Sequence, residues 1–167
     1  MSRRERKKMV MGLNDANKIG LVFDASEAAD YRLTANYVKT LQDMGKKVQC
    51  MGYVQQKKLP GYLLHQVNWV FCQKKDFAWN LRMKTNLMNQ FVDDQLDILI
   101  DLSPSTLFHT KFIAGISNAK YKVGRFNPEQ VDIFDLLIQV SDEVNLEDLM
   151  NHVIHYLKII KKPESDV

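Results

Sequence analysis

The hydrophobic positions of this chain fall into short continuous runs, separated by longer segments in which apolar residues recur at helical spacing. A run of four to eight apolar residues is typical of a strand buried on both faces, the kind that parallel sheets contain. The runs predict strands at residues 18–24, 46–54, 68–72, 97–102, 120–125 and 135–140. Strands alternating with helices predict an α/β fold: a three-layer, Rossmann-like, mostly parallel sheet of five or six strands with helices on both faces.

Small and polar residues mark where the helices begin and end. Ser26 stands where an N-cap belongs and Gly45 where a helix ends, so a helix is predicted between them. The pair Ser103–Pro104 has the same signature, with proline at the first helical position. Asn145 precedes a regular apolar stripe and is predicted to cap the last helix. Residues 83–92 predict one more helix.

Length and composition predict a single domain. The 167 residues are 46% hydrophobic, enough for one substantial core. We expect a basic arm or short helix at 1–17, one Rossmann-like domain at 18–162 and a tail at 163–167. No apolar run is long enough to span a bilayer, and the basic N-terminus lacks the apolar segment of a secretory signal. With Cys50 and Cys72 as small buried hydrophobes, these features predict a cytoplasmic protein.

The net charge of +3 is unevenly distributed. The first cluster of basic side chains is at the N-terminus: Arg3, Arg4, Arg6, Lys7 and Lys8. The second is in the middle of the chain, interleaved with aromatic residues: Lys57, Lys58, Lys74, Lys75, Arg82 and Lys84. Basic groups on phosphates and exposed aromatic rings under bases hold single-stranded nucleic acid. The alternative is a solvated face above core aromatics.

One small-molecule site is predicted at the end of the strand at 97–102. Ligands of doubly wound sheets bind at the carboxyl ends of strands, which places Asp101 and Ser103 at the ligand edge. A carboxylate there accepts hydrogen bonds from hydroxyl groups and repels phosphate, which suits a sugar. His109, one turn into the following helix, is a candidate to join them. A strand-end carboxylate without a ligand is the alternative.

Other sites and cofactors are not predicted. The first strand is followed by Asp24-Ala25-Ser26-Glu27-Ala28 in place of a glycine-rich dinucleotide motif, so no cofactor is expected. His152 and His155 are three residues apart on the last helix, but they flank its apolar stripe and no third ligand is near in the sequence. No metal site is therefore expected.

Residues 97–126 resemble the N-terminal Rossmann-like half of the heptosyltransferase family. The resemblance rests on the run Asp-Ile-Leu-Ile-Asp-Leu, a small-residue helix, Asn118-Ala119-Lys120 and Lys122-Val123-Gly124-Arg125. The whole chain is also similar to a small bacterial family of uncharacterised single-domain proteins. In the transferases the second half holds most of the nucleotide-sugar donor, and a Ser-Leu-Gly-Asp run in the first loop supplies the general base. Ser26 to Asp30 keeps the serine and the aspartate without Leu-Gly, so the resemblance makes Asp30 a catalytic candidate. A solvent-facing carboxylate in the first helical turn is the alternative.

Three functions remain open at this point. The first is a non-catalytic module that docks a protein partner, with the basic arm as a tether. It is favoured because it requires the fewest residues that this sequence lacks. The second is a sugar- or nucleotide-sugar-binding domain like half a transferase. The third is a factor associated with RNA or a ribonucleoprotein. Whether residues 1–8, 57–58 and 74–84 share a face would discriminate between them.

Overall fold

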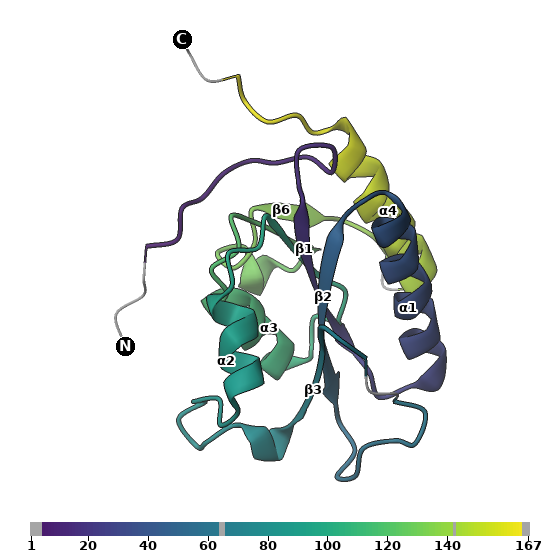
Figure 1. Cartoon of the computed structure of the whole chain (residues 1–167), viewed down its shortest axis with the longest axis vertical. Helices are drawn as coiled ribbons and strands as arrows, with labels where there is room; N and C mark the ends of the chain where they lie inside the picture. The colour runs from purple at the N-terminus through teal and green to yellow at the C-terminus, as the bar shows by residue number, and fades with distance from the viewer. Residues whose placement is uncertain (1–4, 64–65, 142, 165–167) are drawn as a thin grey trace.

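A computed structural model of the chain describes residues 5–63, 66–141 and 143–164, and shows a twisted parallel sheet between two layers of helices (Figure 1). The strands are β1 (Lys18–Asp24), β2 (Lys47–Val54), β3 (Trp69–Gln73), β4 (Ile98–Asp101), β5 (Tyr121–Arg125) and β6 (Leu136–Ile138). Their order across the sheet is β3-β2-β1-β4-β5-β6, and every neighbouring pair is parallel. The chain therefore adds β2 and β3 on one side of β1, then returns to the other side of β1 with β4 and continues outward with β5 and β6. The predicted fold class is confirmed.

Four helices cover the two faces of the sheet. They are α1 (Ala28–Asp43), α2 (Asn86–Asp93), α3 (Phe108–Ile116) and α4 (Leu146–Ile159), with short 3₁₀ turns η1 (Lys74–Asp76) and η2 (Pro128–Gln130). Figure 1 shows α1 and α4 together on one face and α2 and α3 on the other. This division follows from the change of direction between β1 and β4, because right-handed crossovers on the two sides of that point place their helices on opposite faces.

Each face of the sheet has its own hydrophobic core. Along β1, Leu21 and Phe23 pack toward α1 and α4, whereas Val22 packs toward α2 and α3. Side chains of a strand alternate between faces, so a strand covered on both sides has to be apolar at nearly every position. This is why β1 and β4 form continuous hydrophobic runs in the sequence.

Two of the predicted helix ends are confirmed. The side chain of Asn145 accepts a hydrogen bond from the backbone N–H of Asp148 at 2.8 Å, which caps α4. Gly45 lies just beyond α1 with a φ of +82°, a left-handed conformation that costs glycine little because it has no Cβ.

Ser26 and Ser103 are not helix caps, and both predictions are wrong for the same reason. Glu27 occupies the N-cap position of α1, and α3 begins only at Phe108. Both serine hydroxyls bind the aspartate two residues earlier in the chain, Asp24 or Asp101. A serine engaged with a preceding carboxylate is not available to cap the helix that follows.

The predicted helix at 83–92 begins later than expected, at Asn86. Met83 pairs with Phe77 in an antiparallel bridge, and the side chain of Thr85 accepts a hydrogen bond from Met88 to cap α2. The apolar Met83 therefore belongs to a hairpin before the helix.

The N-terminal segment, expected to be a basic arm or short helix, is packed against the domain from residue 5 onward. Residues 5–17 contain no helix, and Met11 and Leu13 are buried in the core between the sheet, α1 and α4. Gly12 lies so close to the carbonyl of Ile160 that a Cβ there would stand 1.8 Å from the oxygen. The backbone N–H of Met9 binds the carbonyl of Lys120 at 3.0 Å. Arg3 and Arg4 lie outside the described residues.

Candidate functional site

All six strands end at one edge of the sheet, the lower edge in Figure 1, which we call the carboxyl edge. The point where the strand order reverses, between β1 and β4, is where doubly wound sheets bind ligands. At this point both strands end in the pattern Asp-x-Ser: Asp24 and Ser26 after β1, Asp101 and Ser103 after β4. In each pair one carboxylate oxygen accepts both the serine N–H, at 3.0 Å and 2.9 Å respectively, and the serine hydroxyl. The two neighbouring strands therefore end in the same local turn.

The Asp101 turn lies inside the protein. Lys111 of α3 donates to Asp101 Oδ2 at 2.7 Å and to Ser103 Oγ at 2.9 Å, and Ser103 Oγ lies 2.6 Å from the hydroxyl of Thr110. These four residues are all buried, with Asp101 only 1% exposed. A ligand hydroxyl would have to displace Lys111 from a buried carboxylate, which is costly. The structure thus brings Asp101 and Ser103 together, with Asp101 buried and paired to Lys111.

Sequence reasoning missed Lys111. Its signal was a lysine directly before the apolar stretch Phe112-Ile113-Ala114, eight residues after Ser103. A lysine on the buried face of a helix needs an anionic partner.

The Asp24 turn differs because it reaches solvent. Asp24, Glu27 and Asp30 form what we call the acidic turn, around the N-terminus of α1. Asp30 is partly buried, and burial, followed by the charges of Asp24 and Glu27, raises its pKa above the ordinary value. None of the three forms an ion pair with a described residue. Helix α1 has no side-chain cap, so its first N–H groups are also free of side-chain acceptors.

The loop between β2 and β3 folds over the acidic turn. Gln55 donates from its side chain to Asp24 at 2.8 Å and from its backbone to Ser26 Oγ at 2.9 Å. Gln56 donates to the carbonyl of Ser26 at 2.7 Å, and the hydroxyl of Tyr62 donates to the carbonyl of Ala25 at 2.8 Å. Burial, then the charges of the acidic turn, raise the pKa of Tyr62. Amides and an aromatic ring therefore stand beside the three carboxylates.

His109 packs among aromatic side chains and takes no part in the hydrogen bonds given above for the Asp101 turn. Its ring stacks on Tyr53 with centroids 4.8 Å apart and lies 4.9 Å from that of Phe77. Burial, and after it the charge of Lys74, lowers the pKa of His109. The structure gives it a packing role at the edge of the core between the sheet, α2 and α3.

The described residues of the first basic cluster and those of the second lie at opposite edges of the sheet. Arg6 forms two hydrogen bonds of 2.7 Å with the carboxylate of Asp135, and Lys8 lies 2.9 Å from the same group. Asp135 immediately precedes β6, so these contacts are at the edge where the strands begin, the amino edge. The second cluster lies on the two loops that protrude at the carboxyl edge, at the bottom of Figure 1. Residues 5–8 and the second cluster therefore cannot act as one surface.

Two absences are established for the part of the chain that the structure describes. No group of three histidine, cysteine, aspartate or glutamate side chains there could hold a metal ion, and His152 and His155 are both exposed on α4. None of the described helices is long and apolar enough to cross a membrane.

Comparison with protein families shows which family the chain belongs to. A family model described as a family of unknown function, DUF6913, matches residues 1–160. The chain belongs to this family. No curated protein matches its sequence.

Two solved structures share the fold of this DUF6913 chain. A glycosyl transferase of family 9 from Veillonella parvula DSM 2008 superimposes with a TM-score of 0.58 at 16% identity, covering 89% of this chain and 42% of the transferase. The Escherichia coli heptosyltransferase WaaC with ADP gives 0.51 at 12% identity, covering 89% of this chain and 49% of the enzyme. The chain thus spans less than half the length of each enzyme. The resemblance to one Rossmann-like half is confirmed at the level of fold.

Proposed function

We propose that this chain is a binding module for a hydroxyl-rich, sugar-like ligand, held at the acidic turn. The observation that carries the proposal is the convergence of Asp24, Glu27 and Asp30 on the uncapped start of α1, without an ion pair to any described residue. Carboxylates accept hydrogen bonds from hydroxyl groups and repel phosphate. A partly buried group with a perturbed pKa at the ligand edge of such a sheet marks a functional-site candidate.

The surrounding groups support the same ligand chemistry. The free N–H groups of α1 complement the carboxylates by donating to ligand oxygens. Gln55 and Gln56 bring amide groups that both donate and accept. The ring of Tyr62 offers an apolar surface beside them.

The comparisons support a sugar-like ligand, since both structural neighbours are named as enzymes that transfer sugars. In the sequence resemblance, Asp30 corresponds to the aspartate of the transferase first loop. The structure places Asp30 in the first turn of α1, where its carboxylate contributes to the acidic turn. We assign it ligand binding.

Docking of a protein partner through the basic arm receives less support. Arg6 and Lys8 are engaged with Asp135 of the same chain, and the segment that follows them is part of the core. These residues therefore hold the N-terminal segment in place.

The proposal is tested by calorimetry and thermal shift with a panel of monosaccharides, polyols and nucleotide sugars. At least one should raise the melting temperature of the wild type. Asp30→Asn should weaken its binding by about tenfold, the usual loss for a hydrogen bond to a charged group. Asp43→Asn, at the exposed far end of α1, is the matched control and should bind like the wild type.

The pH dependence gives a second check. Because its pKa is raised, Asp30 becomes protonated at a higher pH than an ordinary aspartate. Affinity for the ligand should therefore begin to fall at that higher pH as the solution is acidified. No shift with any ligand of the panel, or equal affinity in Asp30→Asn and the wild type, would contradict the proposal.

A further inference from the structure

Residues 76–84, from the last residue of η1 to two residues before α2, form a tight hairpin that we call the tryptophan hairpin. The N–H of Ala78 binds the carbonyl of Arg82 at 2.8 Å, and the N–H of Lys84 binds the carbonyl of Asp76 at 2.9 Å. Inside the hairpin the N–H of Leu81 closes a turn onto the carbonyl of Ala78 at 2.9 Å. These bonds give the loop a defined shape.

The alternation of side chains along the hairpin separates an inner from an outer face. Phe77 and Met83 point inward and are both 6% exposed in the core beneath α2 and α3. Arg82 and Lys84 are displaced by one position from Met83, so they stand on the opposite face, and both are exposed. The hairpin is thus anchored by one face and presents cations on the other.

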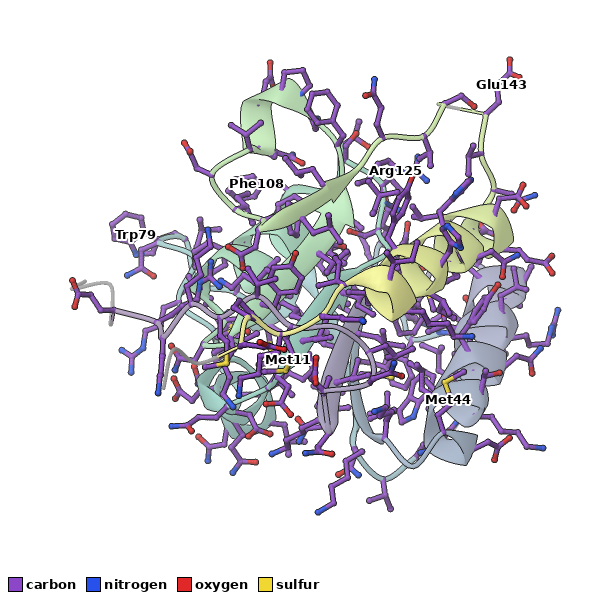
Figure 2. The ribbon with its side chains drawn as sticks, turned by 90° about the horizontal axis from the view of Figure 1, so that it is seen from above. Met11, Met44, Trp79, Phe108, Arg125 and Glu143 are labelled. Carbon is purple, nitrogen blue, oxygen red and sulfur yellow. The ribbon has the colours of Figure 1, made fainter. Side chains whose placement is uncertain are left out.

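Trp79 stands at the tip of this anchored hairpin and is 96% exposed. Figure 2 shows its ring projecting from the flank of the molecule. Tryptophan is a largely buried residue in most proteins, because its ring is large and apolar. A rigid turn that holds the ring wholly in solvent is suited to contact with an external flat surface.

Four cations surround the tip without acidic partners. Lys74, Lys75, Arg82 and Lys84 are exposed, and none of them forms an ion pair with a described residue. Between residues 73 and 92 the sequence has one acidic side chain, Asp76, whose carboxylate already accepts the N–H of Gln73 at 2.8 Å. Lys84 and Lys75 are held together, since Lys84 Nζ donates to the carbonyl of Lys75 at 2.7 Å. The four cations outnumber this single carboxylate, so the tip carries a net positive charge.

A second exposed ring lies on the same flank. Phe108, 58% exposed at the start of α3, has its ring centroid 6.0 Å from that of His109, which in turn is 4.9 Å from Phe77 at the base of the hairpin. Figure 2 shows Phe108 and Trp79 on the same side of the molecule. Behind the hairpin, Arg82 and Lys84 line a hollow of about 380 Å³ together with the amides of Asn86 and Asn89.

We propose that the tryptophan hairpin is a binding site for single-stranded nucleic acid. Trp79 stacks on an unpaired base, and Lys74, Lys75, Arg82 and Lys84 bind the adjoining phosphates. Flat exposed rings set among cations suit this ligand because every base has an aromatic face and every linkage carries a charge. An acidic protein segment would satisfy the cations but leave the ring without a partner. The site is separate from the acidic turn, so this proposal does not depend on the sugar-like ligand.

The test uses fluorescence anisotropy of labelled twelve-nucleotide oligouridine and oligothymidine strands. The wild type should bind both strands, and the slope of log affinity against log salt concentration should be about −3 if all four cations contact phosphates. Trp79→Ala should weaken binding by at least about tenfold, and Trp79→Phe should retain most of it. Arg82→Gln should weaken binding and make the salt slope shallower by about 0.7.

Matched controls come from exposed residues on the opposite face. Tyr156→Ala on α4 and Lys39→Gln on α1 remove a ring and a cation there and should bind like the wild type. Since Trp79 is exposed, its variants should melt at the wild-type temperature. The proposal is overturned if neither strand binds at low salt, if Trp79→Ala binds like the wild type, or if duplex DNA or polyglutamate binds as tightly as the single strands.

Discussion

At the scale of single residues, Asp101 and Lys111 form a buried ion pair. Burying two charges costs several kcal/mol per ion, and the cost is recovered only when both groups are fully hydrogen-bonded. Here the carboxylate receives Lys111 and both donors of Ser103, and the ammonium also reaches Ser103 Oγ. The network fixes the connection between β4 and α3 without a helix cap.

Lys111→Met should lower the free energy of unfolding by about 3–5 kcal/mol, because it leaves the Asp101 carboxylate buried without its partner. The double variant Asp101→Asn/Lys111→Met should recover part of this loss, since asparagine carries no charge and still accepts the N–H of Ser103. Urea denaturation measures the free energy of unfolding of the single and the double variant. A single variant as stable as the wild type would show that the pair contributes little.

At the scale of elements, the N-terminal segment acts as a strap across the amino edge. Arg6 binds Asp135 with both terminal guanidinium nitrogens and also donates to the carbonyls of Ala119 and Lys120, at 3.3 Å and 3.0 Å. Asp135 in turn accepts the N–H of Lys122 at 2.8 Å. One carboxylate therefore joins the strap to the starts of β5 and β6. This explains why Arg6 and Lys8 are held against the domain.

Arg6→Met should destabilise the protein by about 1–3 kcal/mol at pH 7, the range for hydrogen bonds to a charged group. Burial alone raises the pKa of Asp135, but the hydrogen bonds from Arg6 and Lys8 outweigh it, and the pKa lies below its ordinary value. The contribution of this pair to stability is thus complete at pH values above the ordinary pKa of an aspartate. It is lost as the pH falls through the lowered pKa of Asp135 in the folded protein.

The difference in unfolding free energy between the wild type and Arg6→Met should therefore shrink in acid, as measured by denaturation at a series of pH values. Lys7→Met, an exposed neighbour without an ion pair to any described residue, is the control. A difference that stays constant down to pH 2 would exclude Asp135 as the partner that matters.

At the scale of the whole molecule, stability should be greatest at the centre of the sheet. β1 and β4 pair with each other and have neighbours on both sides, whereas β3 and β6 are at the edges. β6 has three residues, of which two are only half-buried. Local opening requires less free energy where fewer apolar contacts are broken.

Native-state hydrogen exchange should confirm this gradient. The amides of Leu21 and Ile100, which are register partners, should exchange only through global unfolding, with an opening free energy equal to that from denaturation. Amides of β6 should open with a smaller free energy. Equal protection in β1 and β6 would indicate one fully cooperative sheet.

Local patterns were enough to predict the parallel sheet. Strands covered by helices on both faces must be apolar at nearly every position, so β1 and β4 are visible as runs in the sequence. Asn145 and Gly45 were correctly assigned because a cap and a left-handed turn depend on residues within one helical turn.

The tertiary structure alone decided what the polar residues do. Ser26 and Ser103 carry the same cap signal as Asn145, but each follows an aspartate that captures its hydroxyl. Whether a carboxylate is free or paired depends on partners far away in the chain: Asp101 is neutralised by a helix that folds over it, and Arg6 finds Asp135 129 residues later. Which hydrophobic residues are buried depends on the local period of a helix or strand, which is visible in the sequence. Which charges pair depends on how distant segments are arranged in space, and the sequence pattern does not show that arrangement.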